Sequence, residues 1–292
     1  MTTPGPSRAG VSSPSCPYCG APGRDLGGLH WTGPAGGGPA RPPRRRRRLR
    51  RTRRFLAMAV VLSLLGAIMV AGLLIIAPSV ANAPALARAL DRAHHAVYPG
   101  QQVPERFAAS LVATEDHRFY SEAGIDPFAI ARVTAGYLTG KPDQGGATLY
   151  QQLAKILYVP GPSGVLGKGE QMLLGIKLAL SYPKAKILQM YSAVAYFGDG
   201  YYGLQAASCG YFGVTPAALT WPQAALLAGL VQAPSVYDPL AHPALARARE
   251  AHVLGRLAAT ETLTRAQAER AYRQPLHLTD GRTGRCTAPA SG

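Results

Sequence analysis

The longest apolar stretch of the sequence runs from Phe55 to Ala77 and contains no charged residue. A helix of this length spans ~34 Å, which is enough to cross a hydrocarbon core of ~30 Å. Its single polar side chain, Ser63, carries a hydroxyl that can hydrogen-bond to its own helix. The pattern predicts a transmembrane helix over residues 55–77.

Ten arginines lie in the fourteen positions from Arg41 to Arg54, directly before this stretch, and no comparable cluster follows it. The positive-inside rule then places residues 1–54 in the cytoplasm and residues 78–292 outside. A cleaved signal peptide is the alternative, because Ala81-Asn82-Ala83 resembles a cleavage site. Signal peptides have apolar regions of only ~7–15 residues, so an uncleaved, single-pass anchor in the cell membrane is favoured.

Composition and charge narrow the choice of partners. The 292 residues are 47% hydrophobic, which excludes disorder of the whole chain. The net charge of +16 comes mainly from residues 1–54, which hold twelve arginines and one acid. Such a tail can bind nucleic acid, but here it abuts a transmembrane segment. We therefore expect membrane lipid, and no nucleic acid, as its partner.

The hydrophobic pattern divides the remainder into segments. The first forty residues are rich in Gly, Pro and Ser, so residues 1–54 are predicted to form a disordered, Arg-rich tail. Residues 78–100 are predicted to be a stem, with a short helix around Pro84–Val97. Residues 101–275 form the globular domain, and residues 276–292 form a loose tail.

Helix-start signals dominate the globular part. Pro104 precedes an apolar pattern of helical spacing, and two segments have the form of capping boxes, Thr220 with Gln223 and Thr264 with Gln267. No run of alternating strands is long enough for a large sheet. The predicted fold class is therefore mostly α.

Four cysteines are too few for a disulfide scaffold. Cys16 and Cys19 form half of a zinc ribbon with no second pair, so no metal site is predicted. Cys209 and Cys286 lie on the predicted extracytoplasmic side, and whether they pair is left open.

Two adjacent carboxylates, Glu115 and Asp116, end an apolar helical pattern. The pattern places Glu115 at the edge of the core, where desolvation makes a carboxylate a better base. The alternative is a pair of surface acids that form ion pairs with Arg118 or Arg132.

A second motif begins with two glycines before a predicted helix. Thr148, Gln152 and Lys155 fall on one face of that helix, beside an apolar stripe. A hydroxyl, an amide and an ammonium at a helix start suit an anionic ligand such as a phosphate. An ordinary amphipathic helix explains the same pattern.

Three further motifs follow, in residues 168–171, 184–203 and 226–239. The first combines a lysine with Glu170 and Gln171. The second is a helix followed by aromatic residues among glycines, and the third is a buried helix that ends in a Pro-bounded turn. Each of them alone is a weak signal.

Together, the order and spacing of the five motifs resemble the peptidoglycan glycosyltransferases of glycosyltransferase family 51, over about residues 101–260. That family includes monofunctional transglycosylases and the N-terminal domain of bifunctional penicillin-binding proteins. The resemblance implies a lysozyme-like helical glycosyltransferase domain.

The resemblance also assigns roles to residues. It makes Glu115 the catalytic base, and it makes Glu170, or Gln171 by straight count, the second acidic position near the donor diphosphate. The residues it implies for substrate binding are Asp116, Arg118, Phe119, Thr148, Gln151, Gln152, Lys155, Lys168 and Gln171.

The implied reaction polymerises lipid II into glycan strands and releases undecaprenyl pyrophosphate. Lipid II, the growing glycan strand and membrane lipid are then the expected partners, with cell-wall synthesis proteins as further candidates. The sequence requires no cofactor. A divalent cation, Mg²⁺ or Mn²⁺, that accompanies the pyrophosphate is left open.

Several positions depart from the family pattern. Ala147 stands at the motif Ser, while Gln171 and Ala179 stand at two motif Glu positions. These departures favour one alternative, a degenerate, non-catalytic scaffold that binds lipid II or the cell wall. A second alternative is a lysozyme-like glycan hydrolase, because the family fold resembles lysozyme, and it would need a second carboxylate near the scissile bond.

Overall fold

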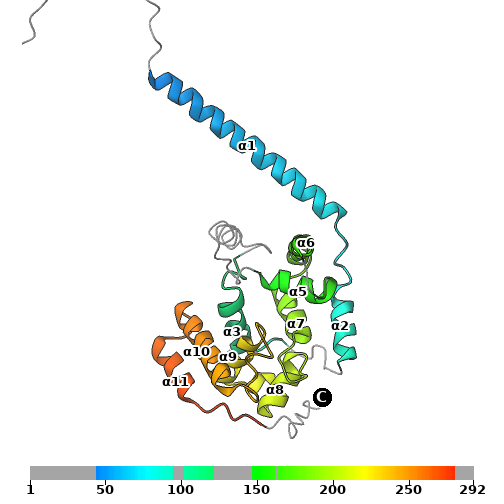
Figure 1. Ribbon diagram of the computed structural model, residues 1–292, viewed down its shortest axis with the longest axis vertical. Coiled ribbons are helices and arrows are strands. Elements are labelled where there is room, and N and C mark those ends of the chain that lie inside the picture. The colour runs from blue at the N-terminus through cyan, green and yellow to red at the C-terminus, as the bar shows by residue number, and fades with distance from the viewer. Residues whose placement is uncertain (1–43, 95–101, 122–146, 162–163, 280–292) are drawn as a thin grey trace, which may run out of the picture. The chain divides into compact units, whose positions relative to one another are not determined.

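The computed structural model describes residues 44–94, 102–121, 147–161 and 164–279 (Figure 1). The chain divides into two compact units, Met1–Val60 and Val61–Gly292. The helices are α1 (Arg44–Ile76), α2 (Ala83–Ala93), α3 (Glu105–Glu115), α5 (Leu149–Tyr158), α6 (Val165–Ser181), α7 (Lys184–Val194), α8 (Leu204–Phe212), the 3₁₀ turn η1 (Pro216–Ala218), α9 (Trp221–Leu230), α10 (Pro243–Ala259) and α11 (Arg265–Arg273).

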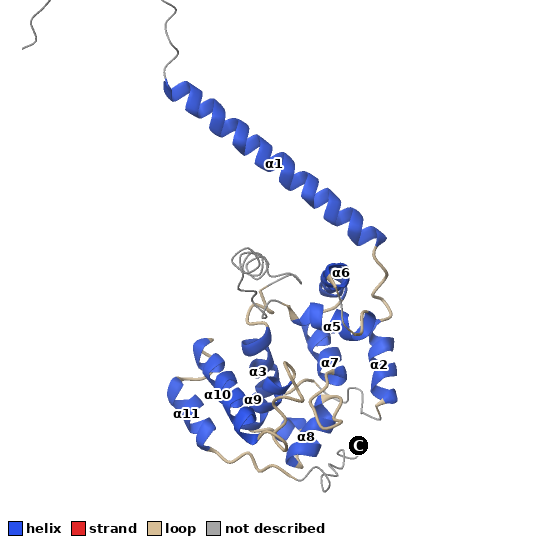
Figure 2. Cartoon of the chain, viewed as in Figure 1, coloured by secondary structure: helices blue, strands red, loops and turns tan. Residues whose placement is uncertain are grey.

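Over these ranges the chain forms no strand, and its only β-pairing is an isolated bridge between Tyr196 and Tyr202 (Figure 2). The prediction of a mostly α fold is confirmed. The stem helix α2 begins at Ala83, one residue before the predicted start, and ends at Ala93, before the predicted end at Val97. Helix α3 starts directly after Pro104 as expected.

Helix α1 contains the predicted transmembrane segment. Its part from Thr52 to Ile76 is 25 residues long, none of it is buried, and it is long and apolar enough to cross a membrane. The helix begins at Arg44, inside the segment predicted to be disordered. Arginine is a good helix former, and extending an existing helix needs no new nucleation, so the arginines continue the apolar helix. Residues 1–43, including Cys16 and Cys19, lie outside the described part.

The core of the second unit is built around α9. Every residue of α9 from Pro222 to Leu230 is buried, which is the pattern of a helix enclosed on all sides. It packs against α3 and α10. On α3, Phe107 and Leu111 are fully buried against this core, as their spacing predicts. The core therefore holds the end of α3, where Glu115 lies.

Both predicted capping boxes are present. Thr264 and Gln267 exchange two hydrogen bonds at the start of α11, with N–O distances of 2.7 and 3.2 Å. At the start of α9, the Thr220 amide donates to Gln223 Oε1 at 3.0 Å.

The predicted loose tail begins later than residue 276. Gln223 Nε2 donates to the Leu276 carbonyl at 3.0 Å, and the Thr279 amide donates to the Tyr211 carbonyl at 2.8 Å. Leu276 is buried. Residues 276–279 are thus attached to α8 and α9 because their backbone groups find partners there. Residues 280–292, with Cys286, are outside the described part.

Candidate active site around Glu115

Glu115 is the last residue of α3, and its carboxylate joins three helices. Gln152 Nε2 of α5 donates to Glu115 Oε2 at 3.1 Å. Arg249 Nη2 of α10 donates to Glu115 Oε1 at 3.2 Å, in an ion pair whose side chains are only 11% and 10% exposed. Each carboxylate oxygen therefore has a donor, and the geometry of the group is fixed from two sides.

The environment of Glu115 acts on its pKa in two directions. Burial raises the pKa above its usual value, while the hydrogen bond from Gln152 and the charge of Arg249 lower it. The net direction is upward. A carboxylate with a raised pKa is a stronger proton acceptor when ionised, and the nearby guanidinium favours the ionised form. The predicted role of Glu115 at the edge of the core is consistent with this environment.

The orientation of the Gln152 amide is set by Tyr191 of α7. The Tyr191 hydroxyl donates to Gln152 Oε1 at 2.8 Å, which leaves Nε2 for Glu115. Tyr191 is buried, and burial followed by the charge of Glu115 raises the pKa of its phenol. The phenol therefore stays protonated and remains a donor. Tyr191, Gln152, Glu115 and Arg249 form a continuous chain of hydrogen bonds, which we call the Glu115 network.

Arg249 reaches Glu115 by passing over α9 at Gly229. Its Nε donates to the Gly229 carbonyl at 3.1 Å, and its guanidinium lies 5.6 Å from the centre of the Tyr237 ring. A Cβ at Gly229 would lie only 2.7 Å from Arg249 Cγ. A side chain at this position and the observed path of Arg249 are therefore incompatible.

We expect Gly229→Ala to weaken both folding and any reaction that uses Glu115. The added methyl group forces the stem of Arg249 to move, and overpacking of this kind costs about 1–3 kcal/mol. Urea unfolding measures the free energy change. The matched control is Gly255→Ala in α10, where there is open space for a Cβ. This substitution should increase the free energy of unfolding by about 0.5–1 kcal/mol. Equal effects of the two substitutions would contradict the steric role of Gly229.

Asp116 and Thr148 join α3 to the start of α5. Asp116 Oδ2 accepts a hydrogen bond from the Leu149 amide at 2.9 Å, and Thr148 Oγ1 accepts one from the Gln151 amide at 3.3 Å. Both side chains are buried. That they contact substrate stays a prediction. They satisfy the free amides of the first turn of α5, and so position Gln152.

Phe119 lies in the core beside this junction, and its predicted contact with substrate stays a prediction. It is fully buried and stacks on Tyr150 with ring centres 5.1 Å apart. Lys184 Nζ donates to the Phe119 carbonyl at 2.7 Å. Phe119 therefore fixes the turn after Asp116. Arg118, in the same turn, is half-buried.

The remaining predicted residues lie on α5 and α6. Gln151 faces α6. At Gly175 of α6 the two helices lie so close that a Cβ on this glycine would be 3.2 Å from the Gln151 amide nitrogen. Lys155, Lys168 and Glu170 are exposed, and Gln171 is half-buried. None of the hydrogen bonds to Glu115 within the described ranges comes from α6.

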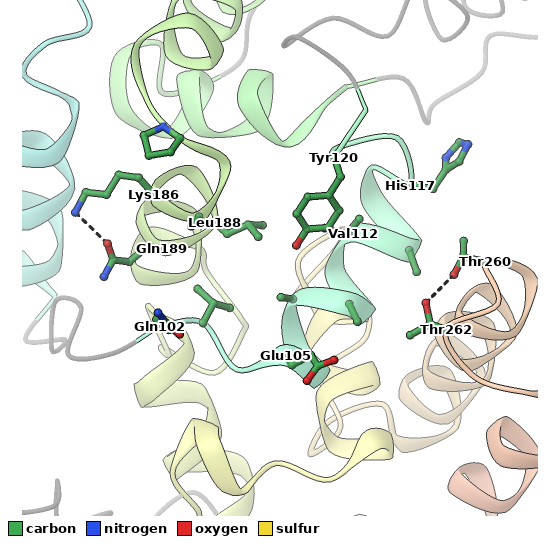
Figure 3. Close-up of a pocket in the computed structure, with 16 residues that line it drawn as sticks. Gln102, Glu105, Val112, His117, Tyr120, Lys186, Leu188, Gln189, Thr260 and Thr262 are labelled. Carbon is green, nitrogen blue, oxygen red and sulfur yellow. Dashed lines mark hydrogen bonds between the residues drawn. The ribbon is translucent and has the colours of Figure 1, made fainter.

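A large cavity lies beside the site rather than at Glu115. It has a volume of about 870 Å³ and lies between α3, α7 and the turn after α10. Figure 3 shows Tyr120 and Val112 on one wall, with Leu188 and Gln189 on the other. Glu115 does not line it. The cavity therefore does not enclose the candidate base.

Sequence reasoning missed Arg249 and the hydrogen bond of Tyr191. A signal for Arg249 exists, because it is three residues after Ala246 and four before Val253, both of which are buried. A cation on such a stripe needs a partner inside the protein. The sequence pattern does not predict that this partner is Glu115.

The described ranges hold no group of three or more His, Cys, Asp or Glu side chains that could bind a metal ion. The divalent cation that accompanies the pyrophosphate stays a prediction.

The helical fold thus holds a largely buried carboxylate that is paired with an amide and a guanidinium. The sequence signature of the family described as "Transglycosylase" matches residues 83–258, which is more than half of the chain. The chain therefore belongs to the transglycosylase family. This confirms the resemblance found from the five motifs and, at the level of the family, the predicted class of enzyme.

Known relatives carry this segment within longer chains. Over 176 residues the chain is 40% identical to penicillin-binding protein 1A of Aquifex aeolicus, covering 60% of this chain and 24% of that protein. Over 155 residues it is 38% identical to penicillin-binding protein 1F of Bacillus subtilis, covering 53% and 22%. The chain thus spans about a quarter of the length of these relatives. A crystal structure of penicillin-binding protein 1A from Haemophilus influenzae aligns with 61% of this chain and 17% of that one, at 21% identity and a TM-score of 0.37.

Proposed function

We propose that this protein is a membrane-anchored peptidoglycan glycosyltransferase that polymerises lipid II into glycan strands and releases undecaprenyl pyrophosphate. The observation that carries the proposal is the pairing of Glu115 with Gln152 and Arg249 in a buried position. Family membership supplies the class of reaction, and this pairing supplies an intact candidate base for it.

Glu115 takes the proton of the acceptor sugar hydroxyl as its oxygen attacks the anomeric carbon of the donor. The new C–O bond forms as the bond to the lipid diphosphate breaks, and the diphosphate leaves with the electron pair. Arg249 keeps Glu115 ionised before the transfer, and the Tyr191–Gln152 pair holds its second oxygen in place. Positioning and charge thus come from residues of the Glu115 network.

The leaving diphosphate requires cations. Lys155 on α5 and Lys168 on α6 are exposed lysines at the motif positions, and each can approach a ligand without first being uncovered. Charge-assisted hydrogen bonds from ammonium groups stabilise phosphate oxygens. We assign the diphosphate to these two lysines, with Glu170 or Gln171 beside them.

The most direct test is incubation of the detergent-solubilised chain with lipid II, followed by analysis of the glycan products. Polymer formation supports glycosyltransferase activity. Cleavage of preformed glycan supports the hydrolase alternative instead, and binding without a product supports the non-catalytic scaffold. The intact Glu115 network favours an enzyme over the scaffold, because a binding protein has no need of a buried base.

We expect Lys155→Ala to weaken binding of the lipid-linked substrate while leaving the fold intact. Lys155 is exposed, so the fold loses little, whereas losing one charge-assisted hydrogen bond costs about 1.5–3 kcal/mol of binding. Titration of lipid II measures the affinity. Lys186→Ala on α7 is the control, since its ammonium bonds Gln189 beside the separate cavity. Unchanged affinity in Lys155→Ala would refute the phosphate role.

We also propose that α1 crosses the membrane with its arginines in the cytoplasm. In spheroplasts, external protease should digest the globular part and spare the segment before α1, because charged arginines resist transfer across the bilayer. Immunoblots against tags at both ends read out the result. Protection of the globular part would reverse the orientation, and a mature N-terminus at Pro84 would show cleavage.

A further inference from the structure

The chain after α11 runs back to the end of α8 (Figure 1). The Thr279 amide donates to the Tyr211 carbonyl at 2.8 Å, and the Thr279 hydroxyl donates to the Gly210 carbonyl at 2.5 Å. The methyl group of Thr279 lies 3.5 Å from the position that a Cβ on Gly213 would occupy. Thr279 thus holds the chain against the last turn of α8, next to Cys209.

Cys209 of α8 takes part in a disulfide bond. It is only 9% exposed, and its sulfur accepts a hydrogen bond from Gln205 Nε2 at 3.4 Å. Within this chain its partner must be one of three other cysteines, which all lie outside the described ranges: Cys16, Cys19 and Cys286.

The position of Cys286 in the sequence suits this partnership. Cys286 is seven positions after Thr279, and seven residues can span up to ~25 Å. The chain is therefore long enough to return to Cys209 and to bring the two Cα atoms to the ~4.4–6.8 Å that a disulfide requires. Cys16 and Cys19 precede α1, which the proposed orientation places across the membrane from Cys209.

The backbone before Thr279 is also fixed by its surroundings. His277 has a φ of 53°, a left-handed conformation that is uncommon for a residue with a side chain. Such a conformation persists only where neighbouring contacts hold the chain. Leu276 is buried on one side of His277, with its carbonyl bonded to Gln223, and Thr279 is bonded to α8 on the other side. The last residues of the chain therefore start from a fixed point beside Cys209.

We propose that Cys209 and Cys286 form a disulfide that attaches the C-terminal tail to α8 after the domain has left the cytoplasm. Disulfides persist outside the cytoplasm and are rare within it, so the proposal rests on the proposed orientation of α1. The bond forms by thiol–disulfide exchange with an external disulfide, such as that of a thiol oxidoreductase. The two cysteine thiols lose two protons and two electrons, and the external disulfide is reduced to two thiols.

This bond closes a covalent ring that includes α9, α10 and α11. The ring therefore contains Arg249, the partner of Glu115 in the Glu115 network. A disulfide stabilises a fold mainly by restricting the unfolded chain, and the restriction increases with the length of the ring. The bond thus stabilises the half of the domain that supplies Arg249, although neither cysteine belongs to the candidate active site.

Peptide mapping of the full-length protein identifies the partner of Cys209. The protein is extracted from membranes with an alkylating agent that blocks free thiols, digested without reductant and analysed by mass spectrometry. We expect a peptide with Cys209 linked to a peptide with Cys286. Alkylation of both residues, or a link from Cys209 to Cys16, Cys19 or a second copy of the chain, overturns the proposal.

Protease treatment of spheroplasts from the same culture separates this proposal from the proposed orientation. Free thiols in a globular part that external protease digests refute the disulfide alone. Free thiols in a globular part that is protected refute the orientation as well. Neither experiment uses lipid II, so a failure of the proposed glycosyltransferase activity leaves both results valid.

Thermal unfolding tests the effect of the bond. Cys286→Ser removes the bond but leaves the packing of Cys209 in place, and it should lower the Tm by about 5–15 °C. Dithiothreitol should lower the Tm of the wild type by a similar amount and leave that of Cys286→Ser unchanged. Cys19→Ser is the matched control and should behave as the wild type in both conditions. Equal Tm values for the wild type and Cys286→Ser without reductant would contradict the proposed attachment of the tail.

Discussion

Glu115→Gln is expected to reduce lipid II polymerisation by ~10²–10⁴-fold, since loss of a general base has an effect of this size. Glutamine keeps the shape of the side chain but cannot accept the hydroxyl proton. The fold should tolerate the change, because the Glu115 network can reverse its donors. Gln152 can turn its amide so that Oε1 accepts from the new amide, and the Tyr191 hydroxyl can accept from Nε2.

The matched control is Glu105→Gln, which makes the same substitution at an exposed site in the first turn of the same helix. Its polymerisation rate should equal that of the wild type. Urea unfolding of both variants should show changes within about 1 kcal/mol, the size of one net hydrogen bond. If the wild-type chain polymerises lipid II and Glu115→Gln does so at the same rate, Glu115 is not the base.

Removing Arg249, the ion-pair partner of Glu115, should have the second largest effect on the rate of lipid II polymerisation. In Arg249→Met the cation that lowers the pKa of Glu115 is gone, so the pKa rises further above its usual value. A larger fraction of Glu115 is then protonated at any given pH, and activity should recover as the pH increases. The acid limb of the kcat/KM profile reports this shift. Arg249→Lys keeps the charge and should restore part of the activity. Arg265→Met on α11 should leave the pH profile of kcat/KM unchanged.

The same variant has a predicted pH-dependent stability. A carboxyl whose folded-state pKa is raised contributes stability at low pH that is lost as pH rises through the folded pKa. Breaking a buried ion pair costs about 3–5 kcal/mol when the remaining charge is uncompensated. Arg249→Met should therefore be most destabilised at high pH and recover at low pH, opposite to its activity. If the stability and the activity of Arg249→Met change with pH in the same direction, Arg249 acts only by stabilising the fold.

Much of the fold follows from local signals in the sequence. Pro104 and the Thr264–Gln267 box mark helix starts correctly, because the groups that cap a helix are close in sequence. The apolar runs that form α1 and α9 are visible without knowledge of tertiary contacts. The burial of Glu115 was also predictable from the residues one and two turns before it.

The partners of Glu115 were not predictable in the same way. Arg249 is 134 positions away, and its role depends on the path over Gly229. The helix period predicted the shared face of Thr148 and Gln152, and the family resemblance alone named Phe119, but neither predicted their partners within the fold. Thr148 caps the start of the helix that carries Gln152, and Phe119 stacks on Tyr150 of the same helix.

The hydrogen bond between Asp116 and the Leu149 amide also bears on how the spacing of the site is kept. It joins positions 33 apart in the sequence, and it ties the end of the helix that carries Glu115 to the start of the helix that carries Gln152. A buried hydrogen bond of this kind contributes about 0.5–1.5 kcal/mol, and leaving its donor unpaired costs more. The distance between the base and its amide donor is therefore set by a contact between two helix ends, and not by the number of residues that separate them along the chain.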